Sequence, residues 1–399
     1  MATAATAGAE GRHAVFFPFP AQGHVKAALG LAQLLHRCHG FQVTFVHTAE
    51  HNRRRLLRSC GLGALAGVSG FRFAAVPDGL PPFEVDASQD MGALLSTTEA
   101  LVSLVAGLLP PVSCVISDVE HVLYGSREMG TPCVTFFTTS AFAFMASQQT
   151  TPSAIIFHTF DDIDREAMAA MSTILPPTYA VGPLPLLLGH VSSGVADTLE
   201  SNLSKENNAS LEWLEGKRPD PVLYVSFGSI TTLMSIAWGL ANSKMDFLWV
   251  LPPEFLEETK ARSHVTSWCP QEAVLRHEAM GAFLTHCGWN SVLESLSAGV
   301  PMLCWPFGAD QYTNARYVCS EWRAGMEIGG DVERDEVEAA VREVMGGGGK
   351  GEEMKRMAME WKEKAAMAAL PGGPSWVNLK KVVNEVLSVA PARNMDVEL

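Results

Sequence analysis

Short runs of apolar and β-branched residues alternate with helix-like stretches along most of the chain, and this alternation constrains the fold more than any other feature. Runs of this length are typical of parallel strands that are buried on both faces. The stretches between them have room for the helices that parallel strands need as crossovers. We therefore predict an α/β protein with two Rossmann-like, doubly wound parallel-sheet domains. The expected strands lie at 13–19, 42–47, 71–76, 114–117, 133–138 and 154–157 in the first half, and at 222–227, 247–251, 264–268, 282–285 and 301–304 in the second.

A stretch rich in Gly, Ser and Asn separates the two halves and has no sustained apolar periodicity, which is typical of a linker. With 399 residues, the chain has the length of two domains rather than one. We predict an N-terminal domain over 1–188, a linker over 189–220 and a C-terminal domain over 221–375. A last helix and a tail are expected over 376–399.

Composition excludes several classes of protein. The chain has 29 Lys and Arg against 43 Asp and Glu, a net charge of −14, so it lacks the basic surface that nucleic-acid partners require. Its eight cysteines are scattered without a CxxC pair, unlike those of a disulfide scaffold or zinc ribbon. The longest apolar stretch is interrupted by Glu99, and no secretory signal is visible. We expect a cytoplasmic monomer without an integral membrane segment.

His24 follows the first predicted strand, on its turn into a helix, and Asp118 directly follows the fourth. The carboxyl ends of parallel strands lie at one edge of a sheet, so the two residues meet if these strands are neighbours. A carboxylate on one ring nitrogen would fix the tautomer of His24 and make it a general base. Each residue also has a structural interpretation, because His24 can cap the following helix and Asp118 can be a helix N-cap. Only together do they favour catalysis.

Polar residues also crowd several strand ends of the second half. Around 286–291 a strand runs into a Gly-containing turn and a helix, whose free backbone N–H groups form a site for a diphosphate. The indole of Trp268 can stack on a planar base, Glu294 can bind ribose hydroxyls, and later polar groups can bind sugar hydroxyls. In the structural alternative, Trp268 and Trp289 are core aromatics and Asp310 is a helix N-cap. The residues of this stretch that we assign to the site are Trp268, Cys269, Gln271, His286, Gly288, Trp289, Asn290, Ser291, Glu294, Asp310 and Gln311.

Two further patterns carry no site. The adjacent His286 and Cys287 lack two more ligands at a zinc-binding spacing, so we predict no metal. The glycine run at 346–351 lies between two helices rather than after a strand, and we interpret it as a loop.

The stretch from Trp268 to Gln311 resembles the plant secondary-product glycosyltransferase box, with WxPQ, HCGWNSxxE and a final DQ in place. The opening PFPAQGHV, the Ser117-Asp118 pair and the FGS at 227–229 are also similar to plant UDP-dependent glycosyltransferases of the GT-B fold. That resemblance covers nearly the whole chain. It implies two Rossmann-like domains facing a central cleft, with the acceptor on the first domain and the UDP-sugar on the second. It also implies that the last helix crosses back to the first domain.

The resemblance also implies a role for each site residue. His24 would be the base and Asp118 its partner, while Trp268 stacks on uracil and Gln271 and Glu294 hold the nucleoside. The final Gln311 points to UDP-glucose, a co-substrate, and no cofactor is implied. Inverting transfer of glucose to a hydroxyl of a small, largely apolar metabolite is the expected reaction. The residues implied to meet the diphosphate are Ser229, His286, Asn290 and Ser291, and those facing the sugar are Trp289, Asp310 and Gln311.

The chain departs from the family pattern mainly by missing internal residues. The segment from Met145 to Ala154 joins two strands almost directly, where the family carries helices that wall the acceptor pocket, and shorter gaps lie near 109–110, 233–237 and 251–252. Glu120 and His121 stand where apolar residues are usual. These departures motivate an alternative, a catalytically impaired remnant that binds UDP-sugar without turnover. A nicotinamide-dependent oxidoreductase is a further alternative, but the first turn has only Gly23 where that class needs a glycine fingerprint.

Overall fold

A computed structural model describes residues 12–48, 69–77, 112–119, 122–123, 131–141, 152–191, 209–219, 221–227, 245–250, 262–266, 269–329, 334–346 and 348–388. Contacts divide these residues into two compact units. The first contains the described residues up to 191 and those from Ala368 onward, and the second contains those from 209 to Met367. Each unit is built around one parallel sheet.

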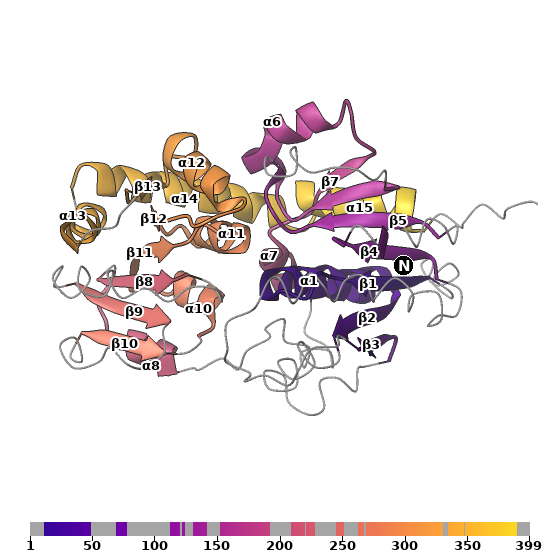
Figure 1. The fold of residues 1–399 in the computed structure, drawn as a ribbon, viewed down its shortest axis with the longest axis horizontal. Helices are drawn as coiled ribbons and strands as arrows, with labels where there is room; N and C mark the ends of the chain where they lie inside the picture. Colours follow the sequence, from indigo (N-terminus) through magenta and orange to yellow (C-terminus); the bar gives the residue numbers. More distant parts are fainter. Residues whose placement is uncertain are drawn as a thin grey trace, which may run out of the picture. The chain divides into compact units, whose positions relative to one another are not determined.

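The first unit has a seven-stranded sheet in the order β3-β2-β1-β4-β5-β6-β7 (Figure 1). All of its described pairings are parallel. The direction of strand order reverses between β1 and β4, which makes their carboxyl ends the switch point where ligands bind in such sheets. The strands are β1 (His13–Phe17), β2 (Gln42–Thr48), β3 (Phe71–Val76), β4 (Cys114–Ser117), β5 (Cys133–Phe137), β6 (Ala154–Phe157) and β7 (Thr178–Ala180).

Alternate residues of each strand point to opposite faces of this sheet, and helices pack on both faces. Phe16 and Ile116 pack with α1 (Gln22–His39), α7 (Leu184–Gly189) and α15 (Pro374–Val382) in one core. Ile155 and Phe157 pack on α6 (Asp161–Met171) in another. Helix α15 continues into a π-helical turn over Val383–Leu387. The central strands therefore need the continuous apolar sequences that the chain provides.

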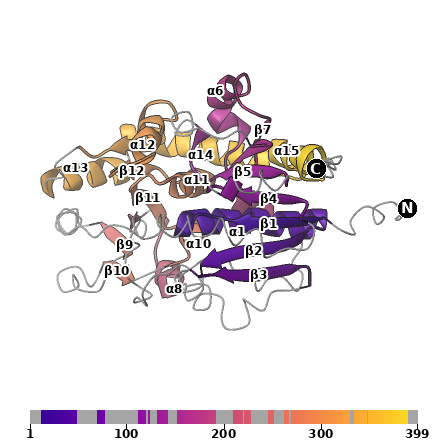
Figure 2. The same cartoon turned by 45° about the vertical axis from the view of Figure 1, so that its right-hand side comes forward.

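The second unit repeats the plan with six strands in the order β10-β9-β8-β11-β12-β13 (Figure 1). Figure 2 shows β9, β10, β11 and β12 from another side. Its switch point lies between β8 and β11, the counterparts of β1 and β4. The strands are β8 (Val222–Ser226), β9 (Asp246–Val250), β10 (Ser263–Thr266), β11 (Met280–Thr285), β12 (Met302–Cys304) and β13 (Gly325–Glu327). The helices are α8 (Ala209–Glu215), α10 (Gln271–Arg276), α11 (Trp289–Ala298), α12 (Gln311–Ser320), α13 (Arg334–Met345) and α14 (Lys350–Ala369).

The predicted fold class is confirmed, and several strands have the expected bounds. β3, β4 and β6 match the sequence analysis at both ends, whereas β7 and β13 were missed. Each missed strand has three residues and lies at a sheet edge, so it is too short to show a period.

Two expected segments differ from the structure. Helix α8 lies inside the predicted linker at 189–220, and its sequence shows no clear apolar period because only Ser210 and Leu214 of its seven residues are buried. The last helix begins at Pro374 rather than at 376. Its Ser375 hydroxyl donates to the Gly182 carbonyl at 2.5 Å, which ties the helix to the first unit. The exact domain limits stay predictions, because residues 192–208 lie outside the described ranges.

Candidate functional site

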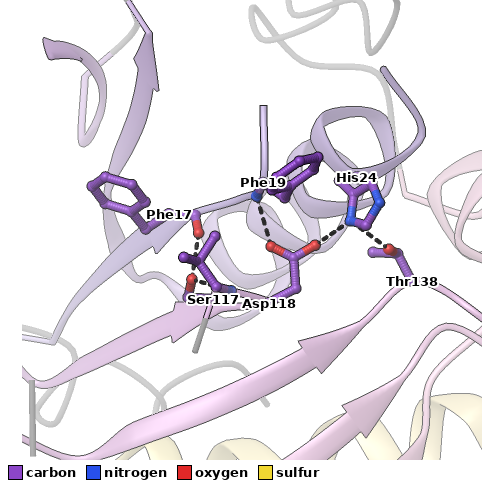
Figure 3. A network of polar contacts seen from close by, with 7 residues as sticks. Phe17, Phe19, His24, Ser117, Asp118 and Thr138 are labelled. Carbon is purple, nitrogen blue, oxygen red and sulfur yellow. Dashed lines mark hydrogen bonds and ion pairs between the residues drawn. The ribbon is translucent and has the colours of Figure 1, made fainter. Parts of the chain in front are cut away.

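Three neighbouring strands of the first sheet each end in a polar residue of one cluster. His24 lies on α1, which follows β1, and Asp118 and Thr138 directly follow β4 and β5. The strand order places β4 between β1 and β5, so the carboxyl ends of all three meet at one edge. Figure 3 shows the side chains pointing toward one another from these elements.

The structure brings His24 and Asp118 into direct contact. The Nδ1 atom of His24 lies 2.5 Å from Oδ2 of Asp118, and the second carboxylate oxygen accepts the backbone N–H of Phe19 at 2.6 Å. Asp118 has a nearly buried side chain, 6% exposed, whereas His24 is 31% exposed. The carboxylate is thus held from two sides while the imidazole keeps access to solvent. His24 lies in the first turn of α1, and the Asp118 oxygens contact Phe19 and His24. The residues that Asp118 would cap as a helix N-cap, 120 and 121, lie outside the described residues.

This geometry selects one tautomer of His24. An ionised carboxylate can only accept hydrogen bonds, so the proton of a neutral imidazole belongs on Nδ1, the nitrogen that faces Asp118. The lone pair then lies on Nε2, on the far side of the ring. An imidazolium formed by proton transfer to Nε2 would be stabilised by the same carboxylate. The cluster can therefore act as a general base whose orientation is fixed before substrate binds.

Sequence reasoning missed a third member, Thr138, whose Oγ1 lies 3.0 Å from the same His24 Nδ1 (Figure 3). The signal was available, because Thr138 stands one position past a strand end, as Asp118 does. The turn that carries Asp118 is braced separately. The Ser117 hydroxyl donates to the Phe17 carbonyl at 2.5 Å and accepts the N–H of Val119 at 2.9 Å.

The second unit has a tight turn between β11 and α11, at its own switch point. Cys287 adopts a left-handed backbone conformation with φ of 64°, uncommon for a residue other than glycine. The turn is held by the amide of Asn314, which donates to the Cys287 carbonyl at 3.0 Å, and by the Thr285 hydroxyl, which accepts the Cys287 N–H at 3.2 Å. The strain therefore has compensating contacts. Helix α11 begins directly after this turn, and the N-terminus of a helix can bind an anion.

His286 precedes this helix as a neutral donor. Burial lowers the pKa of His286 from 6.5 to about 4, and a hydrogen bond with the backbone at Ser226 opposes that shift only in part. The ring is therefore uncharged near neutral pH and carries a single N–H. Gly288 makes room for it, because a Cβ on Gly288 would lie 2.5 Å from the His286 Nε2 atom.

Gln271 is the centre of a polar network. It contacts two predicted site residues, Ser291 and Glu294, and one residue that was not predicted, Tyr224. Its Nε2 donates to Ser291 Oγ at 3.1 Å and to Glu294 Oε2 at 2.8 Å, and its Oε1 accepts from the Tyr224 hydroxyl at 3.1 Å. Tyr224 also lies 3.4 Å from the Cys269 sulfur. The motif residues 269–271 and 291–294 are thus connected before any ligand binds, a preorganised arrangement.

We expect Tyr224→Phe to weaken UDP binding while the fold is retained. Tyr224 stacks on Phe283 with ring centroids 4.8 Å apart, and Phe keeps that contact. Burial raises the pKa of the Tyr224 phenol, so the hydroxyl is a neutral donor whose loss leaves Gln271 Oε1 unpaired. Calorimetry should show a Kd for UDP raised roughly 3- to 10-fold, with the free energy of unfolding lowered by about 1 kcal/mol. An unchanged Kd would show that this network does not support the nucleotide site.

The remaining predicted residues occupy different environments. Trp289 is only 3% exposed and its ring packs 6.1 Å from that of Trp322, as the core-aromatic alternative expects, and its contact with the sugar stays a prediction. Asp310 stands at the N-cap of α12 without a side-chain capping bond, and its Oδ2 accepts from Asn314 at 2.9 Å. Gln311 Oε1 accepts the Phe307 N–H at 2.8 Å.

Some expectations fall where the structure gives no test or no support. Ser229, Trp268, Glu120 and His121 lie outside the described residues. Asn290 is on the first turn of α11, beside Ser291.

Within the described ranges, no three His, Cys, Asp or Glu side chains are grouped in a way that could hold a metal ion. None of the helices in those ranges has the length and apolar character needed to cross a membrane.

Two doubly wound sheets each carry polar residues at their switch point, the His24–Asp118 pair in the first and the turn before α11 in the second. The family model for UDP-glucoronosyl and UDP-glucosyl transferase matches residues 105–364. The chain belongs to this family of UDP-sugar-dependent glycosyltransferases. It is similar to a 7-deoxyloganetin glucosyltransferase of Gardenia jasminoides, with 42% identity over 95% of this chain and 98% of the relative. It is also similar to an (R)-mandelonitrile beta-glucosyltransferase of Prunus dulcis, with 40% identity over 94% and 97%.

Solved structures agree on the fold. The crystal structure of Os79 from O. sativa in complex with UDP has a TM-score of 0.76 and 25% identity, covering 93% of this chain and 99% of that one. The sequence comparison also bears on the internal gaps. The alignment with the Gardenia relative extends over 476 residues although this chain has only 399, so the relative carries internal residues that this chain lacks.

Proposed function

We propose that this enzyme transfers glucose from UDP-glucose to a hydroxyl group of a small, largely apolar plant metabolite, with inversion at the anomeric carbon. The relatives at about 40% identity are named as glucosyltransferases of 7-deoxyloganetin and of (R)-mandelonitrile, both compact hydroxylated molecules. The motif that is implied to face the sugar ends in Gln311, and a final Gln at this position points to UDP-glucose. The observation that carries the proposal is the contact between His24 and Asp118.

The first unit would supply the base. The acceptor hydroxyl gives its proton to Nε2 of His24 as its oxygen forms a bond to the anomeric carbon of glucose. The imidazolium that results is stabilised by Asp118 across 2.5 Å. Thr138, on the same ring nitrogen, limits rotation of the imidazole. No covalent intermediate on the protein is required.

The second unit would hold the donor. The bond between the anomeric carbon and the diphosphate oxygen breaks as the new bond forms, and UDP leaves with the electron pair. The N–H groups at the start of α11, with His286 and Ser291, stabilise the charge that develops on the diphosphate. Glu294 and Gln271 hold the nucleoside, with their side chains already joined at 2.8 Å. Because this charge stabilisation comes from the protein, the proposed reaction needs neither a metal nor a cofactor.

The test is glucoside formation by the purified enzyme with labelled UDP-glucose and a panel of small alcohols, cyanohydrins and iridoid aglycones. We expect a labelled glucoside from at least one acceptor, and UDP-galactose serves as the matched donor control. Binding of UDP without glucoside on any acceptor would contradict the proposal and favour the inactive remnant. The comparisons give no support for that remnant, and the His24–Asp118 pair and the Gln271 network are both intact.

We also propose that the enzyme works as a monomer in the cytoplasm. Cys114, Cys287 and Cys304 are buried and form no disulfide. Buried free thiols are typical of a reducing compartment. Light scattering of the purified protein measures the monomer mass directly.

A further inference from the structure

A buried carboxyl group outside the proposed catalytic pair lies in α6 of the first unit. Asp164 is completely buried, and its backbone has φ of −116° and ψ of 19°, values outside the helical region although it lies within the helix. The other buried residues of α6 are Ile163, Ala167 and Met171, all apolar. Burial raises the pKa of Asp164 from 3.8 to about 6, so the group is mostly ionised at about pH 8.

Only one oxygen of this carboxylate has partners. Oδ2 accepts from the Thr159 hydroxyl at 2.6 Å and from the backbone N–H of Ala141 at 3.4 Å, whereas Oδ1 is buried without a hydrogen bond. Leaving a charged oxygen buried and unpaired is unfavourable. An apolar residue would cost the helix less, so a group retained here calls for a reason beyond stability.

The contact with Ala141 leads to the catalytic cluster. Ala141 ends a four-residue segment that begins at Thr138, directly after β5, and Thr138 Oγ1 lies 3.0 Å from His24 Nδ1. Thr138, Ser140 and Ala141 are all buried, so their neighbours restrict movement of the segment between the two contacts. Asp164 holds one end of this segment and His24 meets the other.

Thr159, the second partner of Asp164, is itself fixed. It follows β6, the neighbour of β5, and the backbone of Gly182 passes so close that a Cβ there would lie 2.9 Å from the Thr159 carbonyl oxygen. Asp164 therefore joins a rigid part of the sheet edge, through Thr159, to the segment that carries Thr138.

We propose that Asp164 is a positioning residue that fixes the segment 138–141 and thereby holds Thr138 against the His24 ring. This inference rests on the proposed function, because Asp164 acts through His24. Its hydrogen-bond partners, Thr159 and Ala141, are not the base itself, so it acts on His24 through the segment 138–141. The carboxylate is needed in place of an amide because its charge strengthens the hydrogen bonds that it accepts from Thr159 and Ala141.

The neighbouring charges of α6 are engaged elsewhere and provide a control. Asp162 pairs with Arg165 at the surface, and Asp161 accepts a hydrogen bond from Asn378 at 3.2 Å. Asp162→Asn therefore makes the same chemical change on the same helix without touching the segment at 138–141.

The experiment compares Asp164→Asn with Asp162→Asn at about pH 8, where Asp164 is ionised in the parent enzyme. We expect Asp164→Asn to lower kcat by roughly 3- to 10-fold, because small displacements at a catalytic base are costly, while the KM for UDP-glucose stays within about twofold. The nitrogen NMR signals of the His24 ring, assigned by their loss in His24→Gln, should shift in Asp164→Asn. Asp162→Asn should leave both readouts unchanged.

Equal kcat and unchanged His24 signals in the two variants would overturn the inference while leaving the proposed function intact. Absence of turnover in the parent enzyme would instead defeat the proposed function, and the His24 signals would still test the positioning role. If Asp164→Asn does not fold, Thr159→Val removes one of the two hydrogen bonds to Asp164. It should shift the His24 signals in the same direction, and unchanged signals in that variant would also contradict the inference.

Discussion

Replacing His24 with Gln should lower kcat by about 10²-fold or more without changing the Kd for UDP. Gln has nearly the reach of His and can still donate a hydrogen bond to Asp118, but its amide cannot accept a proton near neutral pH. The acceptor hydroxyl would then have to lose its proton without a base. UDP binding should be unaffected, because the donor residues lie in the second unit and His24 lies in the first. Steady-state turnover and calorimetric titration with UDP measure the two effects separately.

His190→Gln is the matched control, since His190 is exposed, lies after α7 in the same unit and has no part in the cluster. We expect this variant to turn over like the parent enzyme. Near-normal turnover in His24→Gln would remove His24 from the role of base. A large rise in the Kd for UDP in that variant would contradict the division of labour between the two units.

The second large effect is expected from Gly288→Ala, which should raise the Kd for UDP by about tenfold or more. The added methyl group would lie 2.5 Å from Nε2 and 3.0 Å from Cε1 of His286, so the imidazole must move. Gly288 has φ of −59°, which alanine adopts without strain, and the effect therefore arises from the displaced ring. A displaced His286 would leave the position from which the proposed function has it contact the diphosphate.

Gly216→Ala provides the comparison for this variant. Gly216 is in the same unit, directly after α8, and an added Cβ would meet no atom within 4 Å. Its Kd for UDP should equal that of the parent enzyme. If Gly288→Ala bound UDP as tightly as Gly216→Ala does, His286 and the turn before α11 would not form the diphosphate site.

The sequence predicted the framework of the site because parallel sheets obey simple rules. Strands buried on both faces are visible as apolar runs, and polar residues just past their ends must meet at one edge. That reasoning predicts Asp118 beside His24, and the structure confirms it with Nδ1 of His24 2.5 Å from Oδ2 of Asp118. It also located the turn at 286–288, because a strand, a glycine and a helix follow one another there.

Other features depend on packing that a sequence pattern does not reveal. Tyr224 looks like any aromatic residue of a buried strand, yet its hydroxyl supports Gln271 from 47 positions away. Trp289 belongs to the motif that predicts the sugar contacts, and only the structure shows that its side chain is buried beside the Trp322 ring. Asp164 carries no motif at all, and its contact with Ala141 arises only because β5 and β6 are adjacent. Tertiary contacts of this kind decide the detail within a framework that periodicity predicts.

The central claim is a single displacement at the anomeric carbon, driven by a hydroxyl that His24 deprotonates. One measurement tests it most directly, the anomeric configuration of the glucoside released from UDP-glucose, read by proton NMR before any equilibration. Glucose is α-linked in UDP-glucose, so one displacement must yield the β-glucoside, and we predict that anomer alone. An α-glucoside would mean that the configuration is retained, for example by two successive displacements. It would contradict the role assigned to the His24–Asp118 pair.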